Sequence, residues 1–277
     1  MKIFAIRDET DESRKDLAYL FYYEIDKQFY IELPEDADPW EMPLLLDSFA
    51  RKGEHTIDSY WSGLWVRQRI VPPDRQNIGW ILRDNGLESY DEYALLMLAS
   101  GRCEQDDYYL VPIGEGSLPE DIIRRFGRRI EDVVPLQDCC LLALFQDGTI
   151  RKCDMTEYFE KTPRFLILMK RPDYFAGVQV QTGGHGVRWD ENLSISESVL
   201  YETVNQLPLV AEDFYAYASN RIVDATEAAG ILGCSRQYIS ELAKTGKLHP
   251  IKSSGKSTLF LKSGVLKRNW QSRRITT

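Results

Sequence analysis

Arginine and glutamine side chains at the start of a short helix are the groups in this chain best suited to reading a nucleic acid. In the segment "CSRQYISELAKTG", Ser235 can cap a helix that begins with Arg236 and Gln237. In the major groove of DNA, arginine can form two hydrogen bonds with guanine and glutamine two with adenine. The expected DNA-binding residues are Ser235, Arg236, Gln237, Tyr238, Lys244, Lys252 and Lys256.

Local signals define the elements that would hold these residues. Asp224 and Glu227 have the spacing of a capping box at the start of a first helix, Gly233 can make the turn after it, and Gly246 can end the second helix. The stretches "KLHPIK" and "STLFLK" alternate apolar and polar residues around "SSGK", which predicts a hairpin with two lysines at its tip. "SGVLKRNWQ" predicts a last helix capped by Ser263.

This order of elements, from Arg221 to about Gln271, resembles the excisionase/MerR-type winged helix-turn-helix, with "EAAGILGCSRQYISELAKTGKLHPI" as its most similar part. The resemblance implies a second helix that enters the major groove and a hairpin that contacts phosphate or the minor groove. The alternative is a small structural or protein-binding domain, because winged helices also serve in that way. Tyr238 and Glu241 can equally be a solvated flank, or Glu241 can orient a neighbouring arginine or accept from cytosine.

Charge is divided unevenly along the chain. Of its 34 basic and 43 acidic residues, 11 basic and 3 acidic ones lie after residue 220, so that segment carries +8 and residues 1–220 carry −17. A basic patch confined to one segment is typical of an element that binds a polyanion. Residues 1–220, which we call the acidic body, would repel the same polyanion. This indicates that the acidic body has a different partner.

The middle of the chain predicts a small α+β unit. "CLLALF" and "IRKCD" flank "QDGT", in which Asp147-Gly148 suits a tight hairpin turn. Residues 129–206, with "FQDGTIRKCDM", "RPDYFAGVQV" and "VRWDENLSIS", resemble a small bacterial family known only as domain of unknown function twenty-four forty-two; the loop "QTGGHGVRW" is longer here. Members are often fused to a DNA-binding domain or encoded beside a toxin-like protein, which implies a regulatory or antitoxin-like setting. His185 in "TGGHG" is interpreted as part of a flexible strand connection, since no phosphate-binding motif surrounds it.

The N-terminal region carries arginines on both sides of a Pro-Pro turn. Arg67, Arg69 and Arg75 could bind an anion such as phosphate, or they could form internal salt bridges. The pattern around "WSGLWVRQRIVPPDRQNIGW" is similar to the segment that precedes the kinase domain in some HipA-like toxin kinases, but the kinase motifs are lacking, so the resemblance implies no activity. Helical spacing favours core positions for Trp61, Trp65 and Trp80.

The expected fold is multidomain α+β. We expect an N-terminal domain of mixed α/β structure over 1–114, a linker with a short helix over 115–132 and a small α+β domain over 133–206. A linker helix over 207–220 then leads to the winged helix-turn-helix at 221–277. Individual expected helices include Pro39 to Gly53, Thr56–Ile70, Asp74–Asn85 and Tyr90–Ala99, and a helix capped by Ser196.

Several classes of protein are disfavoured. The five cysteines lack metal-binding spacing and their number is odd, which predicts reduced thiols in a cytoplasmic protein without a metal or cofactor. No run of about 18 apolar residues predicts a membrane span, and the N-terminus turns acidic too soon for a signal peptide. No set of nucleophile, base and orienting residue is recognisable, so we do not expect an enzyme.

Two functions are therefore expected. The first is a sequence-specific DNA-binding protein, a bacterial or phage transcriptional regulator, whose acidic body senses or binds a partner. The second is an antitoxin-like or adaptor protein that neutralises a basic partner and regulates its own operon. Because one short helix contacts few base pairs, we expect double-stranded DNA to be bound by a homo-oligomer or by a complex with another DNA-bound protein. Any contact between copies of the chain is expected within residues 1–210, because no heptad helix occurs.

Overall fold

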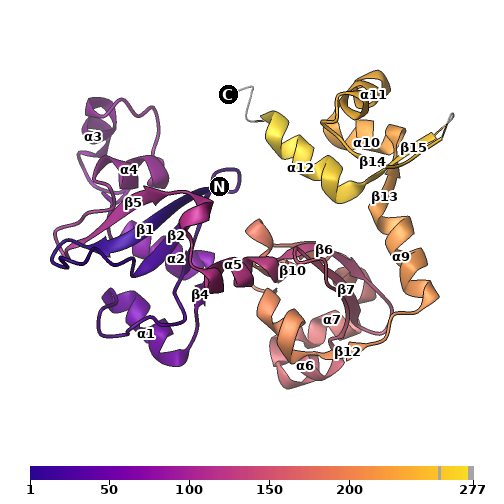
Figure 1. Cartoon of the computed structure of the whole chain (residues 1–277), viewed down its shortest axis with the longest axis horizontal. Helices are drawn as coiled ribbons and strands as arrows, with labels where there is room; N and C mark the ends of the chain where they lie inside the picture. Colours follow the sequence, from indigo (N-terminus) through magenta and orange to yellow (C-terminus); the bar gives the residue numbers. More distant parts are fainter. Residues whose placement is uncertain (255–256, 274–277) are drawn as a thin grey trace. The chain divides into compact units, whose positions relative to one another are not determined.

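The structure of the chain is a computed structural model that describes residues 1–254 and 257–273; of residues 267 and 269–273 only the backbone is described. The chain divides into two compact units, Met1–Phe126 and Gly127–Thr277, whose elements are drawn in Figure 1. Every strand pairing in both units is antiparallel among the described residues, and helices lie between the strands along the chain. The expected α+β class is confirmed at this level.

The first unit is built on a five-stranded sheet. Its strand order is β4-β3-β2-β1-β5, with β1 Lys2–Asp8, β2 Ala18–Tyr23, β3 Gln28–Glu32, β4 Thr56–Ile57 and β5 Tyr108–Ile113. The strands β2 and β3 form a hairpin through the residues "EIDK". Strand β5 pairs with β1, from which it is about a hundred residues away in the sequence. It forms the edge of the sheet opposite to β4.

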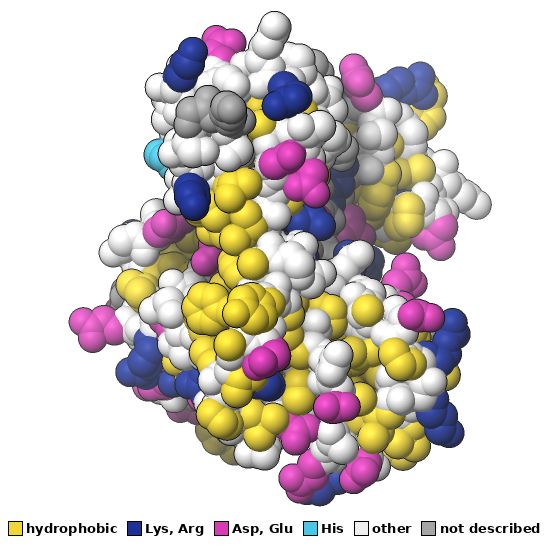
Figure 2. All heavy atoms as spheres, turned by 90° about the vertical axis from the view of Figure 1, so that its right-hand side faces the viewer, with side chains coloured by type: hydrophobic (Ala, Val, Ile, Leu, Met, Phe, Trp, Pro, Cys, Tyr) yellow, Lys and Arg dark blue, Asp and Glu magenta, His cyan; other side chains and the backbone are white. Residues whose placement is uncertain are grey.

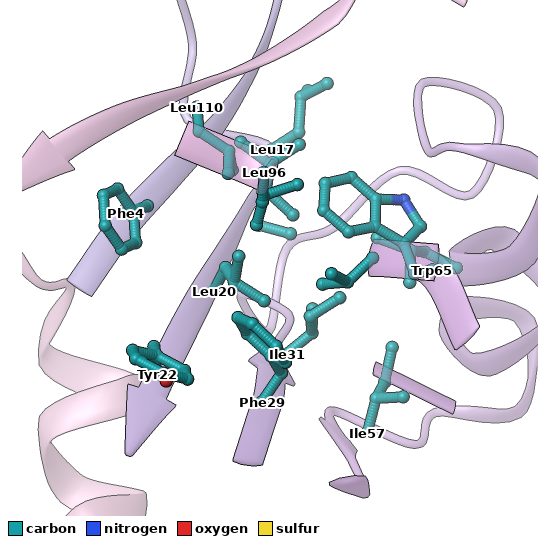
Figure 3. Close-up of a cluster of buried hydrophobic side chains, with 14 of the residues drawn as sticks. Phe4, Leu17, Leu20, Tyr22, Phe29, Ile31, Ile57, Trp65, Leu96 and Leu110 are labelled. Atoms are coloured by element: carbon teal, nitrogen blue, oxygen red, sulfur yellow. The ribbon is translucent and has the colours of Figure 1, made fainter. Parts of the chain in front are cut away.

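Alternate residues of β1 to β3 supply the core on one face of this sheet. Phe4, Leu20 and Ile31 pack there with Trp65, which projects from the helix α2 (Figure 3). The helices of this unit before β5 are α1 Leu44–Lys52, α2 Ser59–Arg67, α3 Ile78–Asp84 and α4 Glu92–Leu98. The expected helix over Thr56–Ile70 is thus too long, because its first residues pair with β3 as β4.

The other face of the same sheet is covered by α5 (Glu120–Gly127), which follows a short turn η1 (Glu115–Ser117). Ile122 and Phe126 pack on Ala5 and Phe21. Arg125 reinforces this contact, because its Nε lies 3.2 Å from the buried carboxylate of Glu32. Residues 115–126 therefore pack as part of the first unit, and the short helix expected within 115–132 is α5.

Two of the three expected core tryptophans are not in the core. Trp65 is buried, but Trp61 is 39% exposed and Trp80 is 65% exposed. Trp80 stacks against Arg83 at 4.5 Å, which covers part of its ring without burying it. Helical spacing alone had favoured a core position for Trp80. This fails because α3 is short and none of its residues is buried.

The first half of the second unit contains two sheets. One has the order β12-β8-β7-β6, with β6 Ile130–Pro135, β7 Cys140–Phe145, β8 Ile150–Asp154 and β12 Asn205–Leu207. The other has the order β11-β10-β9, with β9 Gln179–Val180, β10 Gly186–Arg188 and β11 Ser194–Ser196. The turn at Asp147-Gly148 joins β7 to β8 as expected, with Gly148 at φ +84°.

Short helices close one side of this half. They are α6 Thr156–Lys161, η2 Pro163–Phe165, α7 Leu166–Lys170 and α8 Pro172–Ala176. Phe159, Phe165 and Phe175 are buried in the core, and the partly buried ring of Trp189 packs against all three. After β11 comes a π-helical turn, η4 Val199–Thr203, and Ser196 does not cap it; Ser196 lies in β11, with its Oγ 2.9 Å from Ser198 Oγ.

The second half of this unit begins with α9 (Ala211–Arg221), which corresponds to the expected linker helix, and leads directly into β13 (Ile222–Asp224). The elements that follow are α10 Ala225–Leu232, α11 Arg236–Lys244, β14 Pro250–Ser254, β15 Ser257–Leu261 and α12 Lys262–Arg273. The strands form a sheet of order β13-β15-β14. Helix α12 starts at Lys262, so its expected cap residue, Ser263, lies inside the helix.

Within the part of the chain that the structure describes, no helix is both long enough and apolar enough to cross a membrane.

Candidate nucleic-acid interface

Local hydrogen bonds fix the start of α10 as the sequence predicted. The carboxylate of Asp224 accepts hydrogen bonds from the backbone N–H of Thr226 at 2.6 Å and of Glu227 at 2.8 Å. The side chain of Glu227 accepts one in return from the N–H of Asp224 at 2.9 Å. The capping box is thus confirmed, and it orients α10 at the point where β13 ends.

The turn between α10 and α11 depends on Gly233, which has a φ of +64°. A residue with a Cβ is disfavoured in this left-handed conformation. Ser235 then caps α11, since its Oγ accepts a hydrogen bond from the N–H of Tyr238 at 3.2 Å. The Ser235 hydroxyl keeps a proton that it can donate, because it serves the helix only as an acceptor.

The inner face of α11 is held by apolar packing. Ile239 and Leu242 are buried against Ala228 of α10, Phe260 of β15 and Leu248, which precedes β14. This burial leaves the opposite face of the helix in solvent. The exposed residues of that face are Arg236, Gln237, Ser240, Glu241 and Lys244.

Charges on the exposed face are arranged with a cation near each end. Arg236 lies at the N-terminus of α11 and Lys244 at its C-terminus, with Glu241 between them. Among the described residues, neither Arg236 nor Lys244 makes an ion pair. Hydrogen bonds from the N–H groups of Glu227 and Thr226 hold the pKa of Asp224 below its ordinary value, and Arg236 adds a smaller electrostatic contribution. The Arg236 guanidinium therefore faces solvent. It is close enough to lower the pKa of Asp224 but does not form an ion pair with this carboxylate.

The hairpin presents a further cation. Lys252 lies on β14, the edge strand of its sheet, and every residue of β14 is exposed. Lys256, which the sequence predicted as a DNA-binding residue, lies outside the described residues. Tyr238 is 43% exposed at the first turn of α11, so both interpretations of this residue remain predictions.

The N-terminal arginines have different surroundings. Arg69 is buried, with its Nη2 2.6 Å from Asp106 Oδ2 and its guanidinium over the ring of Trp65 at 3.9 Å. Arg67 Nη1 lies 3.7 Å from Glu92 Oε1 on α4. Arg75 is exposed in the loop after the Pro-Pro turn. Internal ion pairing, the second interpretation from the sequence, thus describes Arg67 and Arg69; Arg69 is too deeply buried to meet an external anion.

His185 lies in the core rather than in an open loop. It follows the turn η3 (Thr182–Gly184) and is 4% exposed. Burial holds the pKa of its imidazole well below the ordinary value, and the nearby Arg129 acts in the same direction. A neutral, enclosed imidazole with a cation beside it is packed into the domain, so the expectation of a flexible connection is wrong.

Sequence reasoning missed a groove in the second unit. A cavity of about 1080 Å³ lies between the β7 and β8 strands, the α7 and α8 helices and the start of α9. We call it the acidic groove after the carboxylates in its lining, Asp138, Asp154, Asp173, Glu212 and Asp213. Among the described residues, Lys152 is the single basic residue of the lining. The excess of acidic residues before residue 221 was the signal in the sequence, but it did not indicate where they converge.

The remaining candidate chemistry is limited. All five cysteines are free thiols. Burial raises the pKa of Cys153 to about 12, so this thiol is not a nucleophile at neutral pH. Within residues 1–254 and 257–273, histidine, cysteine and carboxylate side chains do not gather in threes as a metal site would require. No family model, curated protein or solved structure matches this chain.

Proposed function

We propose that this chain is a sequence-specific DNA-binding protein that regulates transcription. In this proposal residues 221–277 form a winged helix-turn-helix, α11 is the helix that reads base edges, and the β14–β15 hairpin contacts the DNA backbone. Arg236 and Gln237 would form the sequence-dependent hydrogen bonds, while Lys244 and Lys252 would neutralise phosphates.

One observation carries the proposal: the polar face of α11 is exposed while its opposite face is anchored in a core. A helix that reads base edges must present its side chains from a rigid position. The caps formed by Asp224 and Ser235, together with the buried Ile239 and Leu242, meet that requirement. A helix-turn-helix contacts few base pairs with one helix, so we propose that the DNA-bound form is a homo-oligomer.

The second candidate function is an antitoxin-like or adaptor protein that binds a basic partner and represses its own operon. The acidic groove favours it, because carboxylates from separate elements converge there in a body with a charge of −17. Opposite net charges would accelerate association with such a partner.

The test is an electrophoretic mobility shift with the DNA upstream of the protein's own gene, over a series of salt concentrations. The proposal expects binding that weakens steeply as salt rises and that prefers this DNA over a scrambled duplex. The double variant Arg236→Ala/Gln237→Ala should lose the preference. If the variant keeps the full preference, α11 does not read the sequence and the adaptor function becomes the better account.

A further inference from the structure

We propose that the acidic groove is the docking site for a basic, amphipathic peptide segment of a partner protein. This goes beyond DNA binding, since it assigns a second site and the chemical class of its occupant. The groove lies in the second unit, on the opposite end of α9 from the strand β13.

Uncompensated negative charge is the first argument. Among the described residues, the side chains of Asp138, Asp173 and Glu212 make no hydrogen bond or ion pair, and Asp154 accepts only from the N–H of Thr156 at 3.0 Å. The one lysine of the lining does not neutralise them, because Lys152 is bound 2.9 Å from Asp213. A guest that brings cations would therefore be attracted without first having to displace existing partners.

The carboxylates act on the interior of the groove as well as on its rim. Two thiols, Cys139 and Cys140, belong to the lining. Burial raises the pKa of both, and the charges of Asp138 and Asp154 raise them further. The carboxylates thus act on these two lining thiols, where their negative charge disfavours the thiolate and would favour a cationic guest.

Size and apolar lining distinguish a peptide from a small cation. A volume of about 1080 Å³ exceeds what most small-molecule sites occupy. Leu168 and Phe175 are buried in its wall, and Val210 is exposed at the start of α9. Lysine and arginine side chains pair an apolar stem with a charged head, so a segment that alternates them with leucine-like residues matches both parts of the lining.

The surroundings of the groove extend its apolar character. Leu209, Val210, Phe214 and Tyr215 are exposed on α9 and on the residues before it. Figure 2 shows the side of the molecule on which α9 lies in Figure 1, and hydrophobic side chains form a continuous stretch there with Asp and Glu along its lower part. Apolar area bordered by carboxylates suits an amphipathic basic segment that is longer than the groove itself.

The experiment measures binding of a fluorescent synthetic peptide of alternating leucine and lysine to the full chain, by fluorescence anisotropy. The variant Asp138→Asn/Asp173→Asn/Glu212→Gln should weaken binding by about tenfold, because it removes three solvent-facing charges that each contribute modestly to an ion pair with the peptide. The matched control, Glu157→Gln/Glu160→Gln/Glu191→Gln, removes the same charge from exposed positions outside the groove and should change binding by less than about twofold.

Three results would overturn the proposal. The first is equal weakening in both triple variants, which would mean unspecific attraction to an acidic protein. The second is undiminished binding of a peptide whose leucines are replaced by serine, or displacement of the peptide by an equal concentration of spermine, since either would show that the apolar lining is not used. The third is the absence of peptide binding to the unaltered chain. Arg236→Ala/Gln237→Ala should bind the peptide normally, so failure of the DNA-binding proposal would be seen separately.

Discussion

Lys152 on β8 and Asp213 on α9 form an ion pair that is almost enclosed by the second unit. The Lys152 Nζ lies 2.9 Å from Oδ1 and 3.1 Å from Oδ2 of Asp213, and Oδ2 also accepts a hydrogen bond from the N–H of Val210 at 2.9 Å. At the other end of α9, Arg221 Nε lies 2.8 Å from Asp132 Oδ1 on β6. Helix α9 is thus attached to the four-stranded sheet by a charge pair at each end.

Removal of the lysine should destabilise the second unit. Lys152→Met leaves the buried Asp213 carboxylate without its counter-ion, and we expect a loss of about 3 kcal/mol in the free energy of unfolding. The control Lys161→Met removes the same charge from an exposed pair with Glu157 and should cost less than about 1 kcal/mol. Urea unfolding of both variants measures the difference; equal losses would contradict a buried role for Lys152.

The stability of the second unit should depend on pH through His185. Its pKa in the folded protein lies well below the ordinary value of 6.5. As the pH falls below 6.5, the imidazole is therefore protonated in the unfolded chain but stays neutral in the folded chain. The stabilisation is complete above pH 6.5 and is lost as the pH falls below it, with a slope of at most about 1.4 kcal/mol per pH unit.

The measurement is a series of urea unfolding curves between pH 7.5 and pH 5. His185→Gln should flatten the dependence, whatever its effect on stability at pH 7.5. His249→Gln, at an exposed position, should keep the slope of the unaltered protein. A slope that survives in His185→Gln would assign it to another group.

A methyl group at position 184 should not fit. Gly184 has a φ of +79°, and an added Cβ would overlap the carbonyl oxygen of Ile130 and lie 3.0 Å from Cβ of Arg129. Gly148 has a similar φ of +84° but open space around it. We expect Gly148→Ala to cost about 1 kcal/mol from backbone strain alone, and Gly184→Ala to cost at least about 2 kcal/mol more because it also overpacks the core. Thermal unfolding compares the two, and similar melting temperatures would refute the close contact.

Under the proposed DNA-binding function, Arg236 and Lys252 should affect binding in different ways. Arg236→Ala should cost about 1–3 kcal/mol at one base-pair position and relax the preference there. Lys252→Ala should weaken binding to all sequences alike and lower the slope of log affinity against log salt by about 1. Lys170→Ala, an exposed lysine on α7, serves as the control for loss of charge. Fluorescence anisotropy with single-base variants of the bound duplex separates the two effects.

Features that depend on neighbouring residues could be predicted from the sequence. The capping box of Asp224 and Glu227, the Ser235 cap and the Asp147-Gly148 turn all form within a few residues of chain. Their hydrogen bonds and backbone angles are set locally, so the residue types suffice to identify them. The exposed face of α11 followed from the same kind of reasoning, because its apolar residues recur at helical spacing.

Features that depend on distant segments needed the tertiary structure. Residues 130–132 were assigned to the end of a linker, yet they begin the strand β6, because β7 offers an edge with which they pair. Residues 115–126 cover one face of the first sheet, which their own sequence does not reveal. Trp80 is exposed although helical spacing favoured a core position for it as for Trp65. The burial of a helix depends on the segments against which it packs, and these are distant in the sequence.

The sequence by itself determined the class of fold, the caps of α10 and α11, the turn between these helices, the strands of the β14–β15 hairpin, and the division between an acidic body and a basic end. Only the tertiary structure decided that Asp138, Asp173 and Glu212, far apart along the chain, share one groove, and that His185 is enclosed. The physical reason is that short-range hydrogen bonds and side-chain periodicity are encoded within a few residues. The convergence of charges and the exclusion of water arise only when distant strands and helices pack together.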